Sequence, residues 1–171
     1  MNDKRRAEEE KAKDKIEAQE RNGTVVICMD LQGVLLAPSI NSSSSYFKTK
    51  LAVHNFTLYN MVTKDAVCYV WHEAKGGLTS NEFTSCIIDH LSSLLGANKI
   101  VLYSDGCVYQ NQNSVLANTL SAFSLQRECE VQQKYLVKGH THMEVDSMHS
   151  LIERKPNTPI YSISTMDYIP S

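Results

Sequence analysis

The feature that most constrains the fold is a nearly continuous apolar run, TVVICMDL over residues 24–31, which contains a single carboxylate, Asp30. A strand exposed on one face alternates apolar and polar residues, whereas a strand buried on both faces is apolar throughout. A second run of this kind, KIVLYS over residues 99–104, is followed by Asp105. We therefore expect a sheet whose central strands are covered by helices on both faces.

The other elements alternate in a regular order along the chain. Two β-rich segments separated by a short polar step predict an antiparallel hairpin, and a further segment predicts a fifth strand. Apolar residues three and four positions apart predict three helices. These strand ranges are 50–62, 65–73 and 130–137, and the helix ranges are 79–96, 113–125 and 142–155. The order β-β-β-α-β-α-β-α predicts an α/β fold with a mixed five-stranded sheet flanked by helices, as in ribonuclease H-like folds.

The two segments outside this pattern differ in composition. Residues 1–22 hold seven basic and seven acidic side chains, with Ile16 as the single large apolar residue after Met1. A helix without an apolar face is expected to be solvated, so we interpret residues 1–22 as a helical lead-in or linker that folding does not require. The ribonuclease H-like domain would then span residues 23–171. Residues 33–47, with Pro38 and a run of serines, predict a flexible connection.

Composition narrows the class of protein. The chain has 17 Lys and Arg against 19 Asp and Glu, which argues against a stand-alone basic DNA-binding module but suits an acidic centre that recruits cations. The five cysteines form no C-x-x-C pair, and no apolar run approaches the roughly 20 residues of a membrane span. We expect a nuclear or cytoplasmic protein with reduced thiols and no membrane association.

Three aspartates are the candidates for a catalytic metal centre. Asp30 and Asp105 end two strands expected to be neighbours at the centre of the sheet, and Asp146 lies on the last predicted helix. Like charges this close repel unless a cation shares them. Oxygen ligands of this kind suit Mg²⁺ or Mn²⁺, and such ions support phosphodiester cleavage or transfer. Taken singly, each aspartate could equally cap the loop or helix that follows it.

Residues 139–149, GHTHMEVDSMH, form the densest cluster of metal-capable side chains. In a helix starting near His142, that residue shares a face with Asp146, His149 and Glu153, and Glu153 is a further candidate metal ligand. His140 or His149 could protonate a leaving group, because imidazole titrates near neutral pH. Two alternatives remain open: a zinc site made by His142, Asp146 and His149, for which the H-E-x-x-H motif is missing, and a polar helix surface without a ligand.

A fourth acid has two candidates. Glu73 ends the second strand of the predicted hairpin, and Glu82 lies in the first turn of the helix that follows. Glu73 could equally be a solvated strand end, and Glu82 a favourable charge at a helix N-terminus.

Several segments resemble a domain of unknown function that recurs in animal genomes in transposable-element-derived proteins. They are MDLQGVLL, YFKTKLAVHNFTLYN, CYVWHEA, YSDGCVYQNQN, QKYLVKGHTHMEVDSMHSLIERK and DYIP, and the resemblance runs from about residue 24 to about residue 169. The resemblance implies a ribonuclease H-like core. It places Asp30 in the D-L-Q motif, Asp105 in S-D-G-C, and His140, Asp146 and Glu153 in the last long motif.

The resemblance also implies a function and an alternative to it. The implied function is a metal-dependent nuclease or transposase core acting on nucleic acid, with DNA favoured. The alternative is an inactive, domesticated transposon domain that binds nucleic acid or protein. Longer relatives carry further sequence at both ends, so this chain resembles a fragment or a shortened copy.

Overall fold

The computed structural model describes residues 2–20, 23–37, 50–108, 110–136 and 143–154. Four helices and six strands lie within these ranges. The helices are α1 (Asn2–Glu20), α2 (Ser80–Ser93), α3 (Ser114–Arg127) and α4 (Val145–Arg154). The strands are β1 (Thr24–Leu31), β2 (Leu35–Ala37), β3 (Leu51–Asn60), β4 (Ala66–His72), β5 (Lys99–Asp105) and β6 (Glu130–Leu136). Among the described helices, none is both long and apolar enough to cross a membrane.

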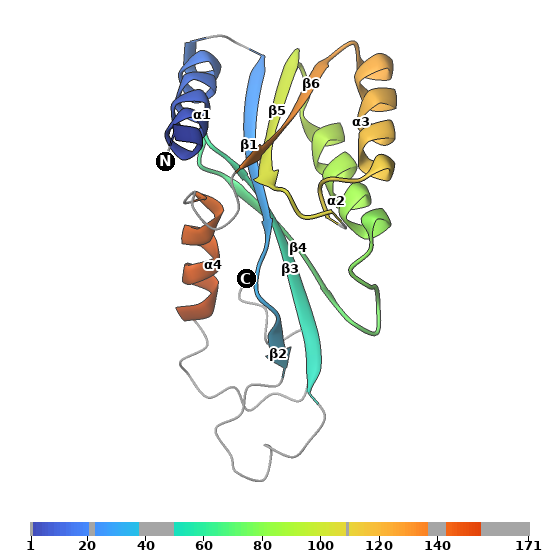
Figure 1. Cartoon of the computed structure of the whole chain (residues 1–171). Coiled ribbons are helices and arrows are strands. Elements are labelled where there is room, and N and C mark those ends of the chain that lie inside the picture. The colour runs from blue at the N-terminus through green and yellow to red at the C-terminus, as the bar shows by residue number, and fades with distance from the viewer. Residues whose placement is uncertain (1, 21–22, 38–49, 109, 137–142, 155–171) are drawn as a thin grey trace.

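The strands form one mixed sheet with β1 near its centre (Figure 1). β3 runs antiparallel to β1 and β4, which confirms the predicted hairpin. On the other side of β1, β5 and β6 add in parallel. The expected mixed α/β fold, with helices on both faces of the sheet, is therefore present.

The predicted count of five strands was wrong, because the segment expected to be a flexible connection contains β2. β1 pairs with β3 up to Leu31 opposite Phe56, and β2 resumes the pairing with Leu35 opposite Val53. β2 thus continues the line of β1 beyond a three-residue interruption. With α1 at the start, the observed order is α-β-β-β-β-α-β-α-β-α. The apolar Leu-Leu-Ala triplet pairs because the edge of β3 continues past the end of β1.

The two faces of the sheet carry different helices, α2 and α3 on one side and α1 and α4 on the other (Figure 1). Successive side chains of a strand point to opposite faces, so the apolar run of β1 supplies both. The larger core, between the sheet and α2 and α3, consists of Ile27, Met29, Phe56, Leu58, Phe83, Ile87, Leu91, Ile100, Leu102, Leu116, Leu120, Phe123 and Cys129. The smaller core, on the α1 and α4 side, consists of Val26, Cys28, Met61, Val101, Tyr103, Leu136, Met143 and Val145.

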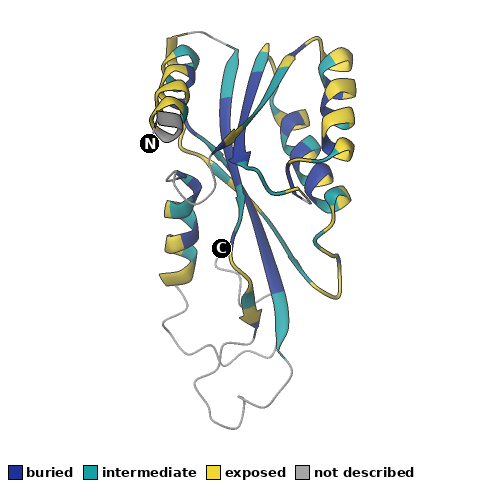
Figure 2. Ribbon diagram, in the orientation of Figure 1, coloured by how far each residue is buried: buried dark blue, intermediate teal, exposed yellow. Residues whose placement is uncertain are grey.

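The helix α1 is not the solvated lead-in that its sequence predicted. Its outer surface is exposed (Figure 2), and even Ile16 is 52% exposed, but Lys11 and Asp14 are buried. Asp14 Oδ2 accepts a hydrogen bond of 2.6 Å from the Tyr103 hydroxyl and forms a 2.6 Å ion pair with Lys134. Lys11 forms an ion pair with Glu144, just before α4. A charged face, rather than an apolar one, therefore holds α1 on the sheet.

Candidate metal centre

The first part of the site is the edge where β1 and β5 end. Cys28 pairs with Tyr103 in the parallel register, so Asp30 and Asp105 stand at the same level, two residues further along each strand. Cys28 and Tyr103 both belong to the smaller core. Because side chains alternate along a strand and neighbouring strands lie about 4.8 Å apart, both aspartates face the α1 and α4 side.

The helix α4 supplies the second part of the site. Val145 is fully buried in the smaller core and anchors the first turn of the helix against the sheet. The backbone N–H of Met143 donates to Asp146 Oδ2 at 3.0 Å, which fixes this carboxylate at the start of the helix. Asp146 and His149 are three residues apart, so they lie on the same face of α4.

These elements bring three predicted residues together. One carboxylate oxygen each from Asp30 and Asp146 and one imidazole nitrogen from His149 lie within 4.8 Å of one another. His149 is 8% exposed, and its Nε2 has no hydrogen-bond partner among the described residues. An unpaired buried polar atom costs about 1–3 kcal/mol. Two carboxylates and one imidazole form a donor set that fits a divalent cation.

The electrostatics of the site favour a bound positive charge. Burial raises the pKa of Asp30 to about 7; the nearby carboxylates of Asp105 and Asp146 add to this shift, and a hydrogen bond to the backbone of Leu31 opposes it. Burial lowers the pKa of His149, against the opposing effect of Asp146 and Glu153. At neutral pH the imidazole is thus in the uncharged form that binds metals, and Asp30 gains or loses its proton in the same pH range.

Asp105 lies beside this cluster without being one of its three members. Its Oδ1 accepts hydrogen bonds from the backbone N–H of Cys107 at 3.3 Å and from Asn111 Nδ2 at 3.1 Å. These are the contacts of an aspartate that stabilises the loop after its strand. Its charge nevertheless raises the pKa of Asp30. Asp105 therefore acts on the site electrostatically and supports the adjoining loop.

Gln32 was not predicted from the sequence, yet it joins α4 to the sheet. Its Nε2 donates to the backbone carbonyl of His149 at 3.2 Å and to Glu153 Oε1 at 3.1 Å. Its Oε1 accepts from Asn55 Nδ2 at 2.9 Å, and both amides are 2% exposed. The sequence pattern that could have identified Gln32 is its position: a polar side chain two residues after Asp30, at the end of an apolar strand. Glu153, expected as a metal ligand, is exposed and serves as a partner of Gln32 outside the three-residue cluster.

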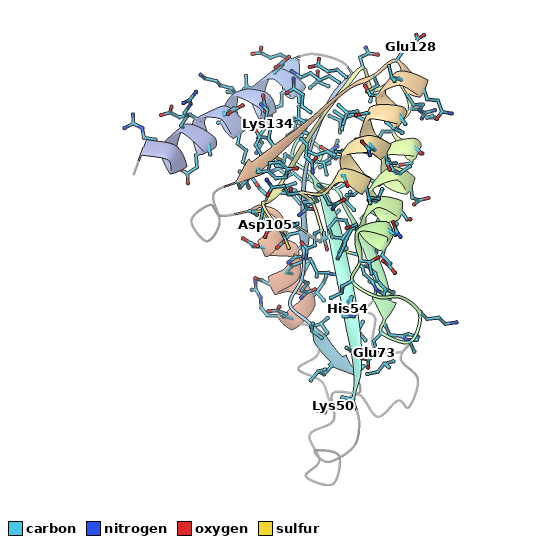
Figure 3. All side chains as sticks on the ribbon, turned by 45° about the vertical axis from the view of Figure 1, so that its right-hand side comes forward. Lys50, His54, Glu73, Asp105, Glu128 and Lys134 are labelled. Atoms are coloured by element: carbon cyan, nitrogen blue, oxygen red, sulfur yellow. The ribbon has the colours of Figure 1, made fainter. Side chains whose placement is uncertain are left out.

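Two further predicted residues, Glu73 and Glu82, are not brought to this site. Glu73 is exposed and accepts a 3.1 Å hydrogen bond from the backbone N–H of Ala52. In Figure 3 it lies near Lys50, well away from Asp105. Glu82 completes the capping box of α2 with Thr79, on the opposite side of the sheet. Both acids are thus engaged in local structure. His140 and His142 lie outside the described residues, so the role of His140 and the zinc alternative with His142 stay predictions.

A match to a known family provides the identification. The sequence model of a domain of unknown function, DUF7869, matches residues 48–167, well over half of the chain. The chain belongs to the DUF7869 family. The matched range of this DUF7869 chain includes Asp105, Asp146 and His149, whereas Asp30 precedes it. No curated protein matches the sequence.

Two solved structures are distantly similar to this DUF7869 chain. One is a chain of the Mos1 strand transfer complex, with 10% sequence identity and a TM-score of 0.45, covering 96% of this chain and 51% of that one. The other is a chain of the simian T-cell lymphotropic virus intasome in complex with the PP2A regulatory subunit B56 gamma, with 11% identity and a TM-score of 0.42. It covers 78% of this chain and 43% of that one. The DUF7869 chain thus spans about half the length of these proteins or less.

Proposed function

We propose that this DUF7869 chain is a ribonuclease H-like catalytic core that cleaves or transfers phosphodiester bonds with the help of a divalent metal ion, Mg²⁺ or Mn²⁺. The observation that carries the proposal is the convergence of Asp30, Asp146 and His149, with Asp105 beside them, where β1 and β5 end. Residues far apart in the chain, from β1 and from α4, meet there.

The sheet topology supports the same interpretation. β4, β3 and β1 follow one another as antiparallel neighbours, and β5 and β6 add in parallel on the other side of β1. This is the arrangement that ribonuclease H-like folds have, once β2 is counted as the continuation of β1. In open sheets, the ends of the central parallel strands form the common location for ligands.

The chemistry follows from the groups at this edge. Asp30 and Asp146 would hold the cation through oxygen, and His149 through nitrogen. A bound divalent ion lowers the pKa of a water molecule and neutralises charge on a phosphate. Asp105 places further negative charge next to Asp30 and so increases the attraction for a cation. The raised pKa of Asp30 means that metal binding must displace a proton near neutral pH.

The substrate and the compartment belong to the same proposal. A phosphodiester substrate is a nucleic acid, and we propose DNA because the motifs resemble transposable-element proteins. All five cysteines are free thiols, which suits the proposed nuclear or cytoplasmic location.

One observation favours a second function. The Asp105 carboxylate is engaged by Cys107 and Asn111, which suits a structural role. A domesticated domain that binds nucleic acid or protein without cleaving it would keep these contacts.

Cleavage of plasmid and labelled single- and double-stranded DNA, with EDTA, Mg²⁺ or Mn²⁺, separates the two functions. The proposal predicts metal-dependent nicking that falls at least about 100-fold in Asp30→Asn, as expected when a group at the reacting centre is removed. Asp65→Asn, in the exposed turn between β3 and β4, is the matched control and should keep full activity. Equal nicking by wild type and Asp30→Asn would identify a contaminating nuclease. DNA binding without nicking would establish the second function.

A further inference from the structure

We propose that His149 makes this site selective for a first-row transition ion such as Mn²⁺ over Mg²⁺. The inference rests on the metal site of the proposed function and adds the class of ion that occupies it. A centre made of aspartates alone would offer only oxygen, whereas this cluster includes one imidazole nitrogen within 4.8 Å of both carboxylates.

The first argument is the unsatisfied nitrogen. His149 is 8% exposed, and its Nε2 has no hydrogen-bond partner among the described residues. A histidine on the surface of α4 could instead pair with water. A buried imidazole next to two carboxylates is stabilised when a cation takes its lone pair, and no other partner for this nitrogen lies among the described residues.

The second argument is that the imidazole is held in place. Gln32 Nε2 donates to the backbone carbonyl of His149, and Asn55 fixes the amide of Gln32 from β3. Val145, one turn earlier, is fully buried against the sheet. The backbone of α4 is therefore held at Val145 and at His149, which keeps the Cα of His149 close to the strand ends that carry Asp30.

The third argument is the preference of the ions themselves. Mg²⁺ requires near-octahedral oxygen coordination and gives up its water reluctantly, so a fixed nitrogen donor is a poor ligand for it. Imidazole suits first-row transition ions, and Mn²⁺ also accepts carboxylate oxygen readily. Two carboxylates with one imidazole match this mixed preference.

The test is metal binding by the full chain without nucleic acid. Metal-free protein is titrated with MnCl₂ and, separately, with MgCl₂, and affinity is measured by calorimetry and by the rise of the melting temperature. We expect a Kd for Mn²⁺ at least about ten-fold below that for Mg²⁺. In His149→Glu, which replaces nitrogen by oxygen at similar reach, we expect the ratio to fall to about three-fold or less, mainly because Mg²⁺ binds more tightly.

His90→Glu is the matched control, because His90 lies on α2 on the opposite side of the sheet; its ratio should equal that of wild type. Equal affinities for the two ions in wild type, or an unchanged ratio in His149→Glu, would overturn the proposal. If His149→Glu does not fold, pulsed electron paramagnetic resonance of Mn²⁺ bound to wild type decides the question. Coupling to a directly bound imidazole nitrogen supports the proposal, and its absence refutes it. None of these measurements depends on DNA cleavage, so a failure of the proposed enzymatic function would be recognised separately.

Discussion

On one face of the sheet, α2 and α3 meet the strands through apolar side chains; on the other, α1 and α4 meet them through a smaller apolar core together with charged and polar groups. In the larger core the ring of Phe83 packs edge-on against Phe56, with centroids 5.1 Å apart, and no part of either side chain is exposed. On the opposite face, buried positions include Lys11, Asp14 and His149. The same strands thus take part in two kinds of packing.

The difference indicates a division of roles. Apolar burial contributes most of the stability of a domain and tolerates no unpaired charge. A cation site needs carboxylates in a partly dehydrated position, and such groups destabilise a core unless other charges compensate them. Both kinds of group occur on the face of the smaller core. Val26 and Val101 are buried within the strands β1 and β5, and Asp30 and Asp105 lie where these strands end. We infer that the α2 and α3 face carries most of the stability, whereas the other face holds the candidate metal centre.

The largest expected effect is on the apolar face. Phe83→Ala removes a fully buried ring that contacts Phe56 and Trp71, so the free energy of unfolding should fall by about 3–5 kcal/mol in urea titrations. The affinity for Mn²⁺ of the protein that remains folded should be unchanged. A loss of metal affinity in this variant would show that the two faces are not independent.

A smaller effect is expected where α1 meets the sheet. Asp14→Ala leaves the Tyr103 hydroxyl without its acceptor and removes one of two carboxylates around Lys134, the other being Glu10. We expect a loss of about 1–3 kcal/mol, measured by urea denaturation. The control is a double-mutant cycle with Tyr103→Phe, which should give a clear coupling energy. A change below about 0.5 kcal/mol would restore the interpretation of α1 as a solvated lead-in.

A further expected effect is a pH dependence of stability that arises at the candidate metal centre. The pKa of Asp30 is raised from 3.8 to about 7, so the native state holds a proton that the unfolded state has lost. The contribution of Asp30 to the free energy of unfolding is fully present below about pH 4. It is lost as the pH rises towards 7, by up to about 1.4 kcal/mol per pH unit. His149, with its lowered pKa, acts in the opposite sense.

Because His149 is common to both proteins, the comparison with Asp30→Asn isolates the contribution of Asp30. Thermal melting in EDTA is measured between pH 4 and 8. As the pH rises, the melting temperature of Asp30→Asn should increase relative to that of wild type. Parallel pH profiles for the two proteins would mean that the Asp30 carboxylate is hydrated in solution.

The sequence predicts the apolar half of this molecule better than the polar half. The strands β1 and β5 and the helix α2 follow from local runs and periodicity, because burial imprints a pattern on neighbouring residues. The docking of α1 depends on Asp14 with Tyr103, and on Lys11 with Glu144, pairs far apart in the chain. Such pairs produce no periodic pattern in the sequence. A charged helix that packs on a sheet therefore has the same composition as one that is solvated.

The same distinction applies to the site. Asp30 and Asp105 could be predicted because each ends an apolar strand, and adjacent parallel strands end at one edge. That His149 joins Asp30 depends on where α4 lies, which the sequence does not specify. Gln32, just after β1, and Asn55, within β3, were missed because a single amide beside apolar residues has no distinctive spacing. Glu73 and Glu82 showed the same local signal as the true neighbours but are used in a strand end and a helix cap.

The polar end of β1 also bears on how the sheet finds its alignment. Both faces of β1 are apolar from Val25 to Met29, so sliding this strand by one residue along β3 would exchange one set of apolar side chains for another with little penalty. The same slip would carry Asp30 to the opposite face and break the bond of Gln32 to Asn55. Hydrophobicity therefore leaves the alignment ambiguous, and the polar residues resolve it. These polar residues therefore fix the register of β1. A copy of this domain that lost them would lose both this constraint on folding and the candidate metal centre.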